Sequence, residues 1–210
     1  MNYTLNSSNS ATYKEKRSEF IGYSKPIKRV SDINSFVKTL KSKHPSSKHI
    51  CWAYRVYING DILENSTDSG EPTGSAGLPI LNTLKHHNIV NCGIFAVRYF
   101  GGIKLGKQGL INAYKTTAKL VIAGNALHKW IPKAQYQIIA SVKYFGKIAN
   151  IVQLNEGKII RDMTTEKLNL LIELPIDKLK YFKTEFGEIT HNSGEIKKQS
   201  EHDQTKEVRK

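Results

Sequence analysis

The segment of this chain best suited to chemistry lies between residues 98 and 109 and reads RYFGGIKLGKQG. Glycines let backbone N–H groups come close to a ligand, and a helix that follows such a loop presents N–H donors and the positive end of its dipole. We therefore expect an anion-binding or nucleic-acid-binding site, formed by Arg98, Gly101, Gly102, Lys104, Gly106 and Lys107. The alternative is that the glycines only allow a tight turn and close packing.

The stretch from Gly101 to Lys107 also matches the first seven positions of a nucleotide-binding P-loop, G-x-x-x-x-G-K. Gln108 then stands where a Ser or Thr hydroxyl would hold magnesium. The chain also lacks a convincing apolar strand that ends in a second metal-binding Asp. The sequence therefore argues against nucleotide hydrolysis.

A second loop, TDSGEPTGSAG, carries carboxylates and hydroxyls close together. Its candidate site residues are Asp68, Glu71, Thr73 and Ser75. Paired carboxylates can do acid–base work, and hydroxyls can contact phosphate, although acidic groups repel phosphate unless a cation intervenes. The alternative is an Asx-type turn in which Glu71 pairs with a basic neighbour such as Arg98.

A strand-like run at 49–58 interleaves aromatic and basic side chains, namely Trp52, Tyr54, Arg55 and Tyr57. A nucleic-acid surface could use the rings for stacking, so Arg55 joins the candidate anion-binding residues. The alternative is that these aromatic side chains occupy half-buried positions of a sheet.

No residue pattern predicts a metal site or a cofactor. The histidines that invite a metal interpretation are His44, His49, His86 and His87. No HxxxH or HExxH spacing joins them, and an adjacent pair cannot face one ligand sphere from a regular helix. The two cysteines, Cys51 and Cys92, lie in apolar runs and are too few for a structural zinc site, so we interpret them as buried thiols.

The elements expected to position these residues begin after a polar leader. They are a strand at 19–27, a helix at 31–43 with Ser31 as its N-cap, a hairpin of 49–58 and 61–66 around Asn59-Gly60, a helix at 78–87, a strand at 90–100, and a helix from Leu110 to about Ala123. In the rest of the chain, the sequence predicts a strand at 136–144, a helix at 146–155, strands at 158–163 and 168–174, a helix at 176–186 and a strand at 193–197. This βαββαβ order is that of a ferredoxin-like domain.

The charge is uneven along the chain. The net charge is +14, of which residues 1–130 contribute +11 from 18 basic and 7 acidic residues. Polyanion binding is therefore expected in the first part. No run is long and apolar enough to span a bilayer, and the polar start lacks the core of a signal peptide, so we expect a cytoplasmic protein without membrane partners.

Three stretches, HPSSKHICWAYR, DSGEPTGSAGLPIL and VRYFGGIKLG…GL…AY, resemble the signatures of the YigZ/IMPACT family. The resemblance implies an α+β protein with an N-terminal IMPACT domain at 1–131, similar to domain 2 of ribosomal protein S5. It also implies a ferredoxin-like C-terminal domain at 132–203, similar to the last domain of elongation factor G, before a polar tail at 204–210. The sequence departs from the family where Lys107-Gln108-Gly109-Leu110 replaces a usual Ala-Gly-Gly-Leu and where Asn112 replaces a common arginine.

Family members are described as translation-associated or nucleic-acid-associated, and the eukaryotic ones bind a partner of a stress-responsive kinase that controls translation initiation. The resemblance therefore implies a non-catalytic translation-associated factor that binds RNA or the ribosome through the basic glycine-rich loop. Two alternatives stay open. One is an enzyme that acts on a small anionic or phosphorylated substrate, with Asp68 or Glu71 as its acid–base group. The other is a protein-binding regulator of translation. We expect no cofactor.

Overall fold

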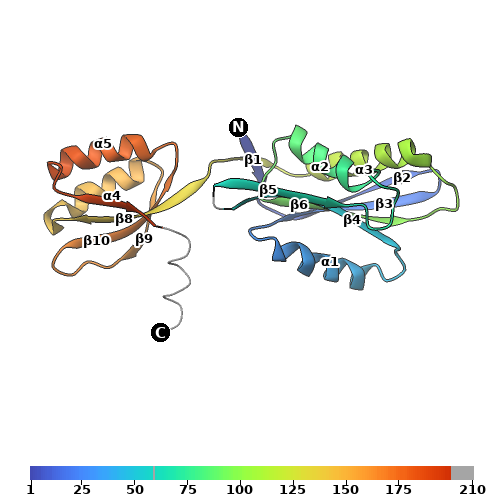
Figure 1. Ribbon diagram of the computed structural model, residues 1–210, viewed down its shortest axis with the longest axis horizontal. Helices are drawn as coiled ribbons and strands as arrows, with labels where there is room; N and C mark the ends of the chain where they lie inside the picture. The colour runs from blue at the N-terminus through green and yellow to red at the C-terminus, as the bar shows by residue number, and fades with distance from the viewer. Residues whose placement is uncertain (59, 200–210) are drawn as a thin grey trace. The chain divides into compact units, whose positions relative to one another are not determined.

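A computed structural model describes residues 1–58 and 60–199 (Figure 1). The chain divides into two compact units, Met1–Trp130 and Ile131–Lys210. Both units mix helices and strands, which confirms the α+β class. Two expectations, the turn residue Asn59 and the tail at 204–210, lie outside the described residues.

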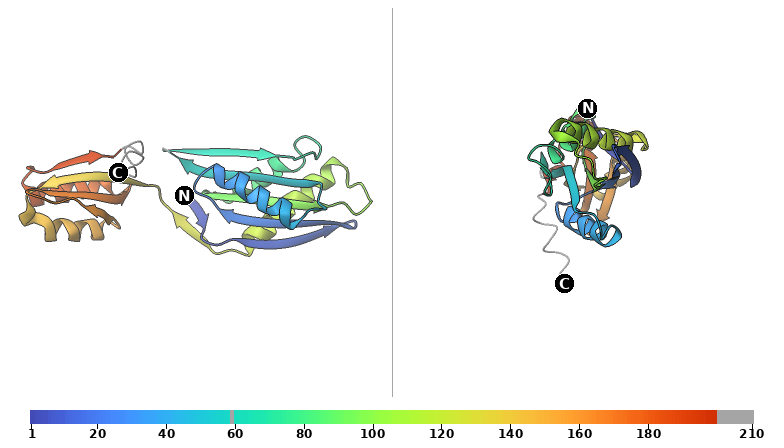
Figure 2. Two further views of the ribbon diagram at one scale, coloured as in Figure 1. Left: turned by 90° about the horizontal axis from the view of Figure 1, so that it is seen from below. Right: turned by 90° about the vertical axis from the view of Figure 1, so that its right-hand side faces the viewer.

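The first unit is built on a five-stranded antiparallel sheet with the strand order β2-β3-β6-β4-β5. The strands are β2 (Asn9–Glu15), β3 (Ser18–Pro26), β4 (His49–Ile58), β5 (Asp61–Thr67) and β6 (Cys92–Tyr99). Helix α1 (Ser31–Lys43) covers one face, while α2 (Gly77–His86) and α3 (Gly106–Ala123) cover the other (Figures 1 and 2). The central strand β6 is buried on both faces, so its sequence is almost continuously apolar.

Two apolar cores lie on the two faces of this sheet. The core under α2 and α3 contains Phe20 and Tyr114, whose rings meet edge to face with centroids 5.2 Å apart. The core under α1 contains Ile33, Leu40 and Phe95. Because successive side chains of a strand point to opposite faces, the three central strands β3, β4 and β6 each supply residues to both cores.

The expectation of a polar leader is wrong, because the first residues form two strands. β1 (Asn2–Leu5) pairs antiparallel with β7 (Leu127–Trp130), and β2 pairs with β3. Leu5 is 1% exposed and belongs to the core under α2 and α3. Residues of β2 alternate between half-buried and exposed, which is typical of an edge strand. Most of these residues are polar.

The N-cap of one helix and the start of another also differ from expectation. Ser31 does not cap α1; instead the carboxylate of Asp32 accepts hydrogen bonds from the backbone N–H groups of Lys28 (2.9 Å) and Arg29 (3.0 Å). Helix α3 begins at Gly106, four residues before the expected Leu110. The Gly-Lys-Gln-Gly segment is therefore helical, and the glycine-rich loop is shorter than its composition indicates.

The second unit contains the expected βαββαβ order. Its elements are β8 (Lys133–Ala140), the short 3₁₀-helix η1 (Val142–Tyr144), α4 (Phe145–Leu154), β9 (Lys158–Asp162), β10 (Leu168–Pro175), α5 (Leu179–Thr190) and β11 (Glu195–Lys198). The sheet order is β11-β8-β10-β9, and its core lies against α4 and α5 around Phe182 and Phe186. The first strand ends at Ala140 rather than at 144, because η1 follows it, and the last helix runs later than expected.

Among the described residues, no helix combines the length and the apolar character that crossing a membrane requires.

Candidate anion-binding site

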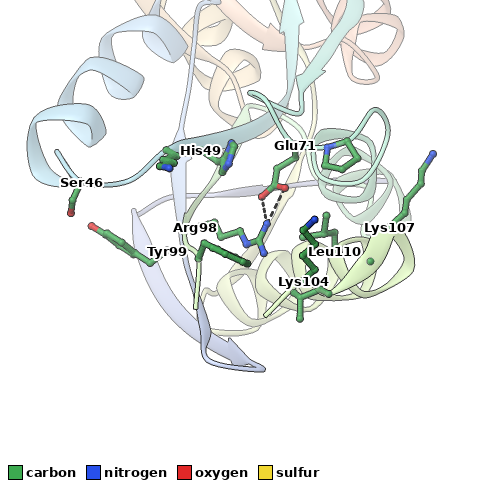
Figure 3. A pocket seen from close by; sticks show the side chains of 13 residues that line it. Ser46, His49, Glu71, Arg98, Tyr99, Lys104, Lys107 and Leu110 are labelled. Atoms are coloured by element: carbon green, nitrogen blue, oxygen red, sulfur yellow. Dashed lines mark hydrogen bonds and ion pairs between the residues drawn. The ribbon is translucent and has the colours of Figure 1, made fainter. Parts of the chain in front are cut away.

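A cleft of about 710 Å³ lies where β6 leads into α3, and it joins the two loops that the sequence singled out (Figure 3). The first loop contributes Glu71 and Pro72, and the second contributes most of residues 98–110. The connection between α1 and β4 adds Ser46 and Lys48. Four of the lining residues are basic and one is acidic, so the cleft favours an anion.

The acidic residue of the cleft is neutralised by a buried ion pair. The Nη1 atom of Arg98 lies 2.8 Å from Oε1 and 3.0 Å from Oε2 of Glu71, and their side chains are 7% and 3% exposed. Burial raises the pKa of Tyr114, so its hydroxyl stays protonated and donates to Glu71 Oε1 at 2.8 Å. The pairing of Glu71 with Arg98 is therefore confirmed, and Figure 3 shows the two side chains meeting between the loops.

Aromatic rings enclose the guanidinium of Arg98. Its central carbon lies 5.5 Å from the ring centroid of Phe20 and 5.3 Å from that of Phe100. Its Nε is buried and has no hydrogen-bond partner among the described residues. Arg98 therefore holds Glu71 in place, and the exposed cations of the cleft are Lys48, Lys104 and Lys107.

The glycines of the second loop do different things. A Cβ on Gly101 would lie 2.0 Å from the backbone carbon of Arg17, and the Gly101 N–H donates to Ser18 Oγ at 3.2 Å. Gly101 therefore allows close packing, as the alternative interpretation held. Gly102 and Gly106 have φ of +84° and +70°, a conformation that favours glycine. Of these glycines, Gly106 lines the cleft.

The start of α3 supplies donors to the cleft. Gly106 is its first residue, and the preceding Leu105 makes no side-chain capping bond. The first N–H groups of a helix have no partner within the helix, and they carry the positive end of its dipole. With Lys104 and Lys107 on either side, this helix start is the most cationic part of the cleft.

The loop at 68–77 is organised by Asp68. One oxygen of its carboxylate accepts the Gly74 N–H at 2.8 Å, and the other accepts those of Ala76 and Gly77, both at 2.9 Å. Burial alone would raise the pKa of Asp68, but these three bonds and Lys107 outweigh it and lower that pKa below its usual value. Asp68 therefore builds the loop and the start of α2, and it does not line the cleft.

The other candidates in this loop lie outside the cleft. The Ser75 hydroxyl is buried, donates to the Pro72 carbonyl at 2.6 Å and does not line the cleft. Thr73 is exposed and does not line the cleft. Of the four residues named for this loop, the structure brings Glu71 alone to the cleft.

Arg55 is not part of the cleft. On β4, His49 lies opposite Arg98, whereas Arg55 lies opposite Cys92, six residues or roughly 20 Å along the strand. Its Nε contacts Glu64 at 3.1 Å, and its Nη1 donates to the carbonyl of Ile89 at 3.1 Å. This end of β4 therefore contributes stability rather than a cleft cation.

Residues 16–122, about half of the chain, match the Impact N-terminal domain family, and this range includes every residue that lines the cleft. The chain belongs to the IMPACT family. It is 27% identical to the IMPACT family member YigZ of Escherichia coli over 179 residues, which cover 85% of this chain and 88% of YigZ.

Other IMPACT relatives match over a shorter range. The family member YvyE of Bacillus subtilis is 37% identical over 99 residues, 47% of this chain and 45% of YvyE, so the match spans about half the length of that relative. The crystal structure of a hypothetical protein covers 95% of this chain and 97% of its own, with a TM-score of 0.68 and 24% identity. That likeness shows the fold.

Sequence reasoning missed several residues of this IMPACT-family cleft, above all Lys48 and Phe100. Lys48 directly precedes β4, and it reaches the cleft because β4 pairs with β6 beside Arg98. Phe100 is 55% exposed, which is high for a large aromatic side chain. The signal for Lys48 was its place in the first family stretch, HPSSKHICWAYR, whereas a single Phe carries no such signal.

The histidines do not form a metal site in the described part of the chain, where no cluster of three potential ligands occurs. His44 is buried, and its ring nitrogens bond the hydroxyls of Tyr23 and Tyr99, each at 2.8 Å. Trp52 and Tyr54 stack with centroids 5.8 Å apart against the core beneath α1. Trp52 is half-buried, as the alternative interpretation held, and Tyr54 is buried more fully.

The interpretation of both cysteines as buried thiols is confirmed. Burial raises the pKa of Cys51 and of Cys92 to about 12. At pH 8 the thiolate fraction is then lower than that of an ordinary cysteine by about three orders of magnitude. We expect both thiols to react with Ellman's reagent at least that much more slowly in the native protein than in guanidinium. Rapid labelling of either thiol in the native protein would contradict this expectation.

Proposed function

We propose that this protein is a non-catalytic, translation-associated factor that binds RNA, free or in the ribosome, through the cleft between β6 and α3. The observation that carries the proposal is the charge of the cleft. Three exposed lysines and a helix start surround a space whose carboxylate, that of Glu71, is neutralised by Arg98. Phosphate groups are the anions that such a combination of backbone donors and lysines suits best.

The shape of the cleft supports a nucleotide ligand. Its volume of about 710 Å³ falls within the range of small-molecule sites, so it can hold one or two unpaired nucleotides. Phe100 presents an exposed ring at the rim, and aromatic rings stack on unpaired bases of any sequence. An unpaired strand could therefore place a phosphate at the start of α3 and a base against Phe100.

The carboxylates favour binding over acid–base catalysis. Both oxygens of Asp68 accept backbone N–H groups, and its pKa is lowered, whereas a general acid at neutral pH needs a raised pKa. Glu71 is held by Arg98 and Tyr114. The rival proposal, an enzyme for a small phosphorylated substrate, is favoured by the compact cleft that joins the two loops, but the two carboxylates that it would use as acid–base groups, Asp68 and Glu71, are both engaged.

The link to translation comes from the family. The resemblance to the IMPACT family implies eukaryotic relatives that act on translation through a protein partner, and this implication keeps a protein-binding regulator as the second proposal. The two proposals differ in what copurifies with the chain. Nuclease treatment removes an RNA-held complex and spares one that is held by protein contacts.

The RNA proposal is tested by replacing Lys48, Lys104 and Lys107 together with glutamine. We expect the affinity for a labelled single-stranded RNA of about 12 nucleotides to fall at least tenfold, because three phosphate contacts are lost. Between about 50 and 200 mM salt, the slope of the logarithm of the binding constant against the logarithm of the salt concentration should become shallower by about 2. This is three times the slope that one phosphate contact contributes on a single strand. Fluorescence anisotropy measures both quantities.

The matched control replaces Lys28, Lys38 and Lys41 with glutamine. These exposed lysines lie on or just before α1, on the face of the sheet opposite to α2 and α3, do not line the cleft, and their replacement removes the same charge. The control should keep most of the affinity. Equal losses in both triple variants would reduce the effect to net charge, and salt-independent binding by the native protein would refute the proposal.

A further inference from the structure

A second groove, of about 460 Å³, is lined by residues of α2 and α3, most of which are exposed, so it lies on the side of the two helices that faces away from the sheet. Its two walls repeat at the helical spacing of four residues, with Leu78, Asn82 and His86 on α2 and Ile111, Lys115 and Lys119 on α3. Side chains at this spacing form one ridge along a helix. No residue lines both this groove and the cleft described above.

The groove is apolar at one end and basic at the other. Leu78, which is 49% exposed, and Ile111 lie in the first halves of their helices, and the buried Pro79 lines the groove next to Leu78. Lys119 lies near the far end, beside the pair of histidines that closes α2. Burial lowers the pKa of His87, and His86 and Lys119 lower it further, which places these three groups near one another.

The groove suits a protein segment better than a nucleic acid. None of its lining residues is acidic, and none is Phe, Tyr or Trp, so the large rings best suited to stacking on a base are absent from its lining. The start of α2 offers no anion site either, because Asp68 already accepts the N–H groups of Ala76 and Gly77. The groove therefore offers an aliphatic end that can contact one or two apolar side chains, and lysines that can pair with carboxylates.

We propose that this groove docks an amphipathic acidic helix of a partner protein. Ile111 and Lys119 are eight residues apart, which is about 12 Å along α3, or a little more than two helical turns. An occupant of this length places one or two apolar side chains against Leu78, Pro79 and Ile111. Its carboxylates, one or two turns away, then pair with Lys115 and Lys119, in the manner of helices that bind grooves by residues at i, i+4 and i+7.

The experiment selects displayed random peptides of about 14 residues against the full chain, a length of roughly four turns. Peptides that also bind the variant Lys115→Glu with Lys119→Glu are discarded. We expect the enriched sequences to pair apolar residues at helical spacing with Asp or Glu one to two turns away. The best synthesised peptide should lose at least tenfold in affinity for that variant and for Leu78→Glu.

The control is Lys38→Glu with Lys41→Glu, which reverses the same charge on the exposed face of α1 and should bind the peptide normally. A peptide with its acidic residues changed to lysine should prefer the Lys115→Glu, Lys119→Glu variant. Selection that yields no peptide sensitive to this variant, or only peptides without acidic residues, overturns the proposal. So does single-stranded RNA that loses affinity for this variant while no peptide is selected, because the groove would then be a nucleic-acid surface.

Discussion

Replacing Arg98 with methionine is expected to lower the free energy of unfolding of the first unit by about 3–5 kcal/mol, the usual cost of breaking a buried ion pair. The reason is that Glu71, whose side chain is 3% exposed, would keep a buried charge without a cation. Both tryptophans, Trp52 and Trp130, belong to this unit, so urea unfolding followed by tryptophan fluorescence measures the effect.

A second variant separates the charge from the packing. In Glu71→Gln with Arg98→Met no charge is buried, and the glutamine oxygen can still accept the hydroxyl of Tyr114. We expect the double variant to be more stable than Arg98→Met alone, because removing both partners avoids the unpaired charge. The single variant Glu71→Gln completes the comparison. If the stability lost in the double variant equals the sum of the losses in Glu71→Gln and Arg98→Met, the ion pair does not account for the effect.

Replacing Asp68 with asparagine is expected to cost about 2–4 kcal/mol at neutral pH. An asparagine side chain offers one acceptor oxygen in place of two, so at least one of the N–H groups of Gly74, Ala76 and Gly77 loses its partner. The exposed Asp61 provides the matched control, since Asp61→Asn removes the same charge from the start of β5. Urea unfolding at neutral pH compares the two variants.

The pH dependence of stability carries the same signature. The folded-state pKa of Asp68 is lowered, so its contribution is present above the unfolded value of about 4 and is lost as the pH falls through the folded value. The native protein should therefore lose stability below about pH 4 more steeply than Asp68→Asn does. Parallel acid limbs for the two proteins would show that the carboxylate is not the group responsible.

The sequence predicted the elements whose apolar side chains recur at a clear period. Helix α1 was placed at 31–43 because Ile33, Phe36, Val37 and Leu40 repeat at helical spacing, and the structure has it at Ser31–Lys43. β1, β2 and β7 were missed because they are short or polar edge strands, which need few apolar residues. Their pairing is decided by neighbours that are distant in sequence.

The candidate site was predicted in location but not in composition. Glycine and lysine content pointed to 98–109, and the opposite charges of Glu71 and Arg98 suggested their pairing, which the structure contains. Local composition could not show that Arg98 would be enclosed between Phe20 and Phe100, or that Asp68 would face three backbone N–H groups. Both arrangements depend on strand register and loop path, which contacts distant in sequence determine.

The pairing of β1 with β7 also sets the shortest fragment that we expect to keep the fold of the first unit. The family match runs from 16 to 122, yet Leu5 fills part of the core and Tyr3 exchanges backbone hydrogen bonds with Asn88 and Val90. A fragment cut at the limits of sequence similarity would leave β3 with an unpaired edge and a cavity in place of Leu5. We therefore expect a stably folded fragment to be longer than the family match at both ends, because β1 and β7, which lie outside the match, pair with each other.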